Sequence, residues 1–172
     1  SGAPPIPEDH QATFLYAVEQ QQAGRYSASA AGVWAYIKGG GEEDPRYDRA
    51  LRLLARDAEA LGFSYAASRW WLEIARERRD ATLVPEAIDA LRRLSERGAY
   101  DEEGLITDFL AVVDLPKLGP ELEAFVSYVQ GLHSLRQLKR SWAQERFALI
   151  HERSPYRARA DYALAVFALA EG

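Results

Sequence analysis

The feature that most constrains this chain is a pattern of helix, turn, small alanine and bulky apolar residue that occurs more than once. Between residues 131 and 155 the pattern is carried by Gly131, Ala143, Phe147, Ile150 and Pro155. An earlier segment carries the same order in Leu51, Leu54, Ala55, Ala58, Gly62, Ala67, Trp71 and Ile74. Recurrence of one helix–turn–helix unit at a period in the thirties is typical of chains in which helix pairs stack in sequence order. The pattern therefore predicts an all-α fold.

Apolar spacing and the breaks at glycine and proline predict four helix pairs and one further helix. The predicted helices cover residues 10–23 and 27–38, 45–61 and 65–78, 84–97 and 102–113, 120–138 and 141–151, and 156–170. They group into repeats at 10–41, 45–80, 84–114 and 120–155, followed by an unpaired final helix at 156–171. Residues 1–9 contain three prolines, which remove backbone donors, so we expect a linker or entry segment ahead of a helical domain at 10–172.

Composition narrows the classes of function. With 48% hydrophobic and 27% charged residues, the chain is typical of a globular protein. Its net charge of −5 disfavours nucleic-acid binding, which needs concentrated positive charge. The absence of cysteine excludes disulfides and thiolate metal sites, and no apolar run is long enough for a membrane-spanning helix.

Residue composition also bears on the origin of the chain. Methionine is absent, including at position 1, so we expect a piece of a longer protein or a processed chain. Arginine outnumbers lysine 18 to 3 and asparagine is missing, a bias typical of GC-rich bacterial genomes. The proline-rich entry suits a mature periplasmic protein, a lipoprotein tether or an interdomain linker. Bacterial periplasm or cell envelope and cytoplasm therefore both stay open.

The repeated residues resemble the tetratricopeptide repeat family, a 34-residue helix–turn–helix unit. In that family a small residue, here Ala67 or Ala143, lets two antiparallel helices approach, and an aromatic, here Trp71 or Phe147, fills the gap between units. The first repeat departs from the pattern at Ser29, the second at Arg79 (where the closing proline would be), and the third at Glu103 and Thr107. The resemblance implies a right-handed α-solenoid of stacked antiparallel hairpins with an open concave groove.

Carried over position by position, the resemblance implies a groove that binds a peptide or a helical partner. The residues that would line it are Phe14, Val18, Arg49, Arg52, Arg56, Ile88, Arg92, Phe125, Tyr128, Leu132, Leu135, Arg159 and Tyr162. The chaperone-tail clamp of the family is not expected, because the chain lacks its lysines and asparagines.

Three arginines and one tryptophan each have two interpretations. Arg49, Arg52 and Arg56 share one helix face, where they either bind carboxylates of a partner or form a solvated stripe paired with Asp48, Asp57 and Glu59. Trp70 immediately precedes the packing residue Trp71, so its side chain points about 100° away from that of Trp71 around the helix. It therefore either anchors an interface or packs under the first helix of the third repeat.

No motif in the chain indicates catalysis or a bound cofactor. His10, His133 and His151 lie far apart and lack metal-ligand spacing, so we expect surface histidines and no metal site. The triglycine at residues 39–41 lacks the flanking residues of a phosphate loop and is interpreted as a flexible connector.

We therefore expect a non-enzymatic scaffold or adaptor that binds another protein or peptide within a larger bacterial assembly. Two alternatives are an accessory helical module of a cell-wall lytic enzyme, and self-assembly into homo-oligomers through the terminal helix.

Overall fold

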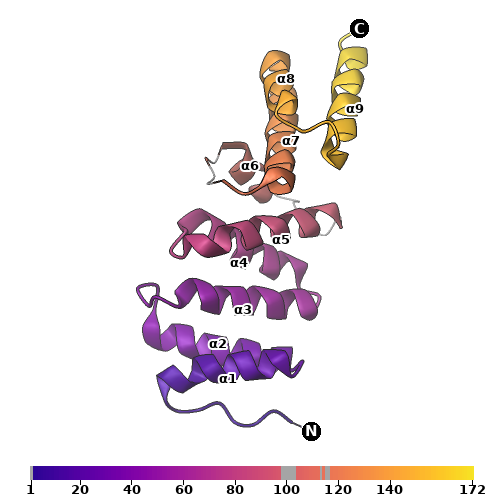
Figure 1. The fold of residues 1–172 in the computed structure, drawn as a ribbon. Helices are drawn as coiled ribbons and strands as arrows, with labels where there is room; N and C mark the ends of the chain where they lie inside the picture. The colour runs from indigo at the N-terminus through magenta and orange to yellow at the C-terminus, as the bar shows by residue number, and fades with distance from the viewer. Residues whose placement is uncertain (1, 98–103, 113, 115–116) are drawn as a thin grey trace. The chain divides into compact units, whose positions relative to one another are not determined.

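The structure is a computed structural model that describes residues 2–97, 104–112, 114 and 117–172. The regular structure of these residues is entirely helical, which confirms the predicted all-α class (Figure 1). The helices are α1 His10–Gln22, α2 Tyr26–Gly40, α3 Tyr47–Ala60, α4 Ser64–Glu77, α5 Val84–Glu96, α6 Leu105–Val112, α7 Pro120–Arg136, α8 Arg140–Ala148 and α9 Pro155–Ala170, with a short 3-10 turn, η1, at Ala81–Leu83. Glu103, where the third repeat departs from the family pattern, lies outside the described residues.

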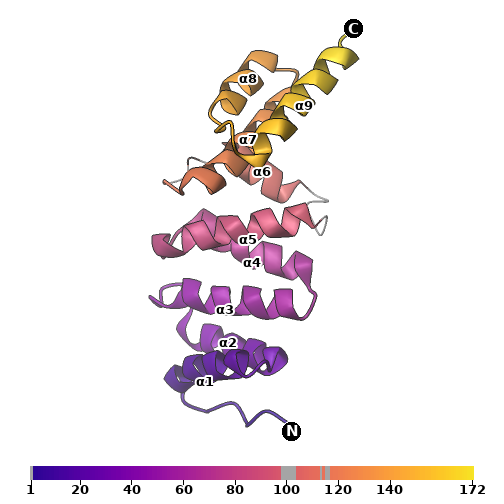
Figure 2. The ribbon, with the colours of Figure 1, turned by 45° about the vertical axis from the view of Figure 1, so that its right-hand side comes forward.

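The chain divides into two compact units, residues 1–100 and 101–172. In the first unit each of the helices α1 to α5 packs against the next one along the chain, and α1 also contacts α3. Figure 2 shows these helices one above another in chain order. One buried cluster of the unit consists of Ala17, Val33, Tyr36, Ala50, Leu53 and Leu54. Ala67 and Trp71 of α4 are also buried, as the repeated pattern predicts.

Three hairpin turns share one backbone geometry. In each, a residue with positive φ follows the first helix: Gly24 at 74°, Gly62 at 81° and Leu138 at 60°. The next amide donates to a carbonyl five residues back, in the pairs Arg25 to Gln20 (2.8 Å), Phe63 to Ala58 (2.8 Å) and Lys139 to Ser134 (2.9 Å). This is the hydrogen bond of a Schellman motif, which ends a helix and reverses the chain. The α1–α2, α3–α4 and α7–α8 turns are therefore built in the same way.

The odd-numbered helices begin at nearly even spacing along the sequence. Helices α1, α3, α5, α7 and α9 start at residues 10, 47, 84, 120 and 155, which are intervals of 37, 37, 36 and 35 residues. The period is slightly longer than 34 residues throughout, because the connections between helices are longer than in the minimal unit. Pro120 and Pro155 each stand in the first turn of their helix, where the missing amide costs no hydrogen bond.

In the second unit α6 packs on α7, α7 packs on α8, and α9 contacts both α7 and α8. The closest packing is between Gly131 of α7 and Phe147 of α8. A Cβ atom at position 131 would lie 2.2 Å from Cε1 of the Phe147 ring. Glycine is therefore required at position 131 for the phenylalanine to reach the α7 backbone. Phe147 therefore fills space within its own helix pair.

One prediction about a connecting segment is wrong in detail. The triglycine is no flexible connector, because Gly39 and Gly40 form the last residues of α2. A Cβ atom on Gly39 would lie 2.2 Å from the His10 ring, which stacks on Tyr36 with ring centroids 4.8 Å apart. Part of the expected linker is held in place, since the Tyr16 hydroxyl donates to the Pro4 carbonyl (2.7 Å).

Candidate functional site

The candidate site is an open groove of about 750 Å³ in the second unit, between α7 and α9. Its lining residues are Tyr128, Leu132, Leu135, Arg136, Ala158, Arg159, Tyr162, Ala163, Val166, Phe167 and Ala170. The resemblance had assigned five of these residues to a partner-binding groove: Tyr128, Leu132, Leu135, Arg159 and Tyr162. The structure brings these five together. We refer to this surface as the α7–α9 groove.

The groove exists because the fully buried residues of α9 lie only near its beginning. Tyr156 and Ala160 are the buried residues of α9, and the Tyr156 ring lies 5.4 Å from the Tyr128 ring. Beyond them the helix exposes Tyr162 (72%) and Val166 (46%). Figure 1 shows this half of α9 leading to the C-terminus. Apolar side chains at i and i+4 on both helices therefore face a space that no described residue fills.

The charge lining the groove is positive. Arg136 and Arg159 are its charged lining residues among those that the structure describes, and none of these described lining residues is an aspartate or a glutamate. The Arg159 guanidinium lies over the Tyr156 ring, 5.2 Å from its centroid, which places a cation at the Tyr128–Tyr156 end. Arg136 is in the last turn of α7, eight residues after Tyr128. The two cations are therefore near opposite ends of the groove.

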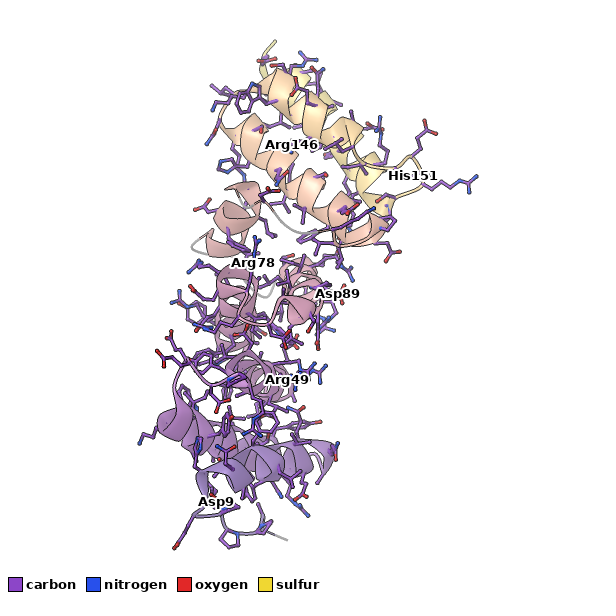
Figure 3. All side chains as sticks on the ribbon, turned by 60° about the vertical axis from the view of Figure 1, so that its left-hand side comes forward. Asp9, Arg49, Arg78, Asp89, Arg146 and His151 are labelled. Atoms are coloured by element: carbon purple, nitrogen blue, oxygen red, sulfur yellow. The ribbon has the colours of Figure 1, made fainter. Side chains whose placement is uncertain are left out.

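The arginine stripe of the first unit makes ion pairs with other helices. Arg52 and Arg56 of α3 both pair with Glu86 of α5. Arg49, which is labelled in Figure 3, pairs with Asp80 at 3.6 Å. The predicted partners Asp48, Asp57 and Glu59 are wrong. The long arginine side chains of α3 reach acidic residues ahead of and within α5. The stripe therefore links two helices of the unit.

Arg92 also pairs within the chain. Its guanidinium lies 2.7 Å from Asp89 and 3.3 Å from Glu96, both on α5 itself. These are i, i+3 and i, i+4 pairs on a helix surface, which stabilise the helix by a few tenths of a kcal/mol.

Two predicted groove residues are buried and cannot contact a partner. Phe125 is 4% exposed, and its ring packs 5.7 Å from the Tyr156 ring. Ile88 is fully buried in the first unit. Phe14 is half-buried, with its edge against Tyr36 and the Arg46 guanidinium 5.0 Å from its centroid. The helix faces that carry these three residues turn toward the interior of their units. A position-by-position assignment from a repeat family does not reveal how far each helix is rotated.

Trp70 packs against the first helix pair, a contact that the sequence did not predict. Its ring meets Trp34 of α2 edge-on at 5.5 Å, and it borders the buried cluster around Val33 and Tyr36. Trp34 is 47% exposed. The exposed aromatic of this pair is therefore Trp34, which the sequence pattern did not single out.

Two buried carboxyl groups were also missed by sequence reasoning. Asp48 accepts from Arg79 (3.1 Å) and from the Asp80 amide (2.8 Å), so Arg79, in place of the family proline, ties α4 back to α3. Asp57 accepts from Gln21 Nε2 (2.9 Å). Burial raises the pKa of Asp57, and the hydrogen bond from Gln21 opposes that rise. Acidic residues inside an apolar helical face are the only sequence signal of such pairs.

The histidines do not assemble into a site. His10 is packed against Tyr36, His133 contacts Gln137, and His151 accepts from the Arg153 amide in a turn. Across the part of the chain that the structure describes, no group of three or more metal-ligating side chains is found. None of the described helices combines the length and apolar character needed to cross a bilayer.

Comparisons with known proteins return no relative. No protein-family model matches the chain, no curated protein is similar to it, and no solved structure matches its fold.

Proposed function

We propose that this chain is a non-catalytic protein–protein interaction scaffold of the tetratricopeptide-like α-solenoid type. Its docking site is the α7–α9 groove, and the occupant is a helical segment of another protein. The observation that carries the proposal is the open apolar groove itself, because five of its lining residues stand where the resemblance puts partner contacts.

The packing within each unit supports the solenoid. Helices pack in chain order, and contacts between alternate helices occur for α1 with α3 and for α7 with α9. Three hairpin turns have the same hydrogen-bond pattern, and the first helices of the pairs recur every 35 to 37 residues. A structure built from one repeated unit has these properties, because each unit buries its apolar face only against its neighbours.

The chemistry of the lining favours a helix over an extended peptide. An extended segment needs partners for its backbone amides and carbonyls, and unpaired buried groups are costly. The groove offers mainly aliphatic and aromatic surface, with the polar atoms of two tyrosines and two arginines. A helix satisfies its own backbone and needs only an apolar stripe.

The dimensions also suit a helix. The lining residues of α9 run from Ala158 to Ala170, which at 1.5 Å per residue is about 18 Å, or a little over three turns. A helical partner would present anchors at i, i+3, i+4 and i+7 along this length.

Selection from a displayed library of helical peptides tests the proposal, with the whole chain as bait. The library varies the apolar residues at i, i+3, i+4 and i+7 and the charge of the flanking positions. We expect enriched peptides to bind wild type and to bind Val166→Asp at least about tenfold more weakly, because the new carboxylate stands among the apolar contacts. Val166 is half-exposed, so the substitution leaves the fold intact.

The matched control is Arg146→Glu on the outer surface of α8, which is labelled in Figure 3 and lies outside the groove. Peptides that bind Val166→Asp as well as they bind wild type would place the docking site elsewhere.

Self-association is the alternative that a specific observation favours. Leu138, Trp142, Leu149 and Leu169 are exposed apolar side chains of the second unit. Light scattering over a concentration series separates the two functions, because a scaffold for other proteins keeps the mass of one chain.

A further inference from the structure

We infer that the helix docked in the α7–α9 groove continues past the end of the groove and places a further apolar residue on Leu138, in the α7–α8 turn. This inference rests on the proposed function and adds the length of the partner helix and one more of its anchors. Leu138 would then help to select the partner, because only a helix long enough to reach this residue gains the contact.

Leu138 stands in a backbone conformation that favours glycine. Its φ is 60°, and the Lys139 amide donates to the Ser134 carbonyl at 2.9 Å, as in the other two Schellman turns. Those turns have Gly24 and Gly62 at the same position, with φ of 74° and 81°. In this conformation a Cβ atom crowds the following carbonyl oxygen, so leucine strains the folded backbone where glycine does not. The geometry of the turn therefore does not explain the leucine.

Packing inside the chain does not explain it either. Leu138 is 77% exposed, so its side chain lies mostly in water. Trp142, four residues further on, is 62% exposed, and Nζ of Lys139 lies 5.2 Å from the centroid of its ring. A strained residue without support from its own fold points to a role in function, and adjoining exposed apolar residues are typical of interaction sites. Contact with another molecule accounts for both properties of Leu138.

The α7–α8 turn lies at one end of the groove. Leu135 and Arg136 line the groove, and the turn follows them directly along the chain. On the opposite wall Ala170 is a lining residue, and Glu171 just after it lies 3.6 Å from Arg140 at the start of α8. Figure 1 shows the beginning of α8 and the end of α9 at the same end of the second unit. A helix that leaves the groove at this end therefore passes beside the turn.

Exposed apolar residues of α9 lead from the groove toward that end. Tyr162, Val166 and Leu169 recur at i, i+4 and i+7, so they form one stripe along the helix. The first two line the groove, and Leu169, which is 83% exposed, stands in the last turn of α9. A partner helix that follows this stripe meets Leu138 next.

The distance sets the length of the partner helix. The groove is about 18 Å long, a little over three turns, and a helix that reaches the α7–α8 turn needs about one or two turns more. Its apolar anchors would then recur at i, i+4, i+7 and i+11, with the last of them on Leu138.

A second copy of this chain is a poor occupant by the same measure. The exposed stripe of α9 that it would offer runs from Tyr162 to Leu169, a rise of about 11 Å. That stripe is shorter than the groove itself and cannot also reach the turn. A helical segment of a different protein has no such restriction.

The experiment extends the peptides that are enriched on the whole wild-type chain by two randomised helical turns at each end, and then repeats the selection. We expect a large apolar residue to be enriched beyond the groove anchors at one end only, the end beside Leu138. The extended peptide should bind Leu138→Asn about tenfold more weakly than wild type, because an apolar contact of leucine size is lost. A peptide cut back to the groove length should bind both chains equally.

Controls separate binding from folding. Asparagine and glycine both tolerate positive φ, so Leu138→Asn and Leu138→Gly should keep the stability of wild type in urea unfolding. Both variants should nevertheless weaken binding of the extended peptide, which a purely structural role of Leu138 would not produce. The matched control is Leu149→Asn, at the other end of α8, where an equally exposed leucine (67%) is replaced and affinity should change less than twofold.

The outcomes distinguish this inference from the proposed function. The longer partner helix is overturned if no residue is enriched beyond the groove anchors, or if the extended peptide binds Leu138→Asn as tightly as wild type. It is also overturned if wild type has a mass above one chain that Leu138→Asn reduces to one chain, since Leu138 then joins two copies. In the first two cases the scaffold function stands as long as the peptides lose binding to Val166→Asp. If no peptide is enriched in the first selection, or Val166→Asp binds as well as wild type, the proposed function itself fails.

Discussion

Replacing Gly131 with alanine tests the packing that holds α7 to α8. In most helices this change is stabilising by about 1 kcal/mol, because glycine has the more flexible unfolded chain. Here the added Cβ would lie 2.2, 2.5 and 2.8 Å from three atoms of the buried Phe147 ring. A rigid ring cannot move aside as a flexible chain end can, so overpacking should cost up to about 3 kcal/mol. We expect a net destabilisation of about 2 kcal/mol.

A double-mutant cycle with Phe147→Leu assigns that cost to the ring. The single Phe147→Leu change should destabilise by about 1 kcal/mol or more through lost contacts. In the double variant the new methyl group occupies space that the ring has left. The double variant should therefore be more stable than the sum of the two single changes predicts, by at least about 1 kcal/mol.

The measurement is urea unfolding followed by circular dichroism, with amide hydrogen exchange to localise the change to α7 and α8. Ala165→Gly on the exposed side of α9 is the control for helix propensity, with an expected loss of about 1 kcal/mol. A Gly131→Ala variant as stable as wild type, or more stable, would refute the close contact between Gly131 and Phe147.

Three other predictions follow from the turns and the buried charges. Positions 62 and 138 both have positive φ, where a Cβ atom is strained, and a Cβ at position 62 would meet no neighbouring atom. Gly62→Ala should therefore destabilise the chain by about 1 kcal/mol, whereas Leu138→Gly should not destabilise it, as urea unfolding of the two variants would show. Burial raises the pKa of Asp57 above its unfolded value, so the contribution of this carboxyl to stability is present at low pH and is lost as pH rises through the folded pKa. Asp57→Asn should therefore raise the unfolding free energy at pH 7 and raise it less near pH 4. An equal gain at both pH values would contradict the burial of the carboxyl group. Glu86→Gln removes the partly exposed ion pairs with Arg52 and Arg56 and should cost less than about 1 kcal/mol, whereas a loss of several kcal/mol would mean that these pairs are essential to the packing of α3 and α5.

The site was partly predictable from the sequence. The repeat register placed Tyr128, Leu132, Arg159 and Tyr162 on one surface, and these residues do line the α7–α9 groove. The same register placed Phe125 there, and that ring is buried. Tyr128 is three residues further along α7 and is half-buried. A small rotation of the helix decides which of the two faces inward.

The sequence by itself determined the helices. Apolar periodicity, turn glycines and N-terminal prolines are local signals, because backbone hydrogen bonds and φ preferences act within a few residues. Each described helix accordingly begins within three residues of its predicted start.

Only the tertiary structure decided the partners of the long side chains. Arg52 and Arg56 reach Glu86, Arg79 reaches Asp48, and Trp70 meets Trp34, and each contact joins residues at least 30 positions apart. Such contacts depend on the rotation and separation of two packed helices. A periodic pattern fixes which face of a helix is apolar, but it does not fix what that face meets.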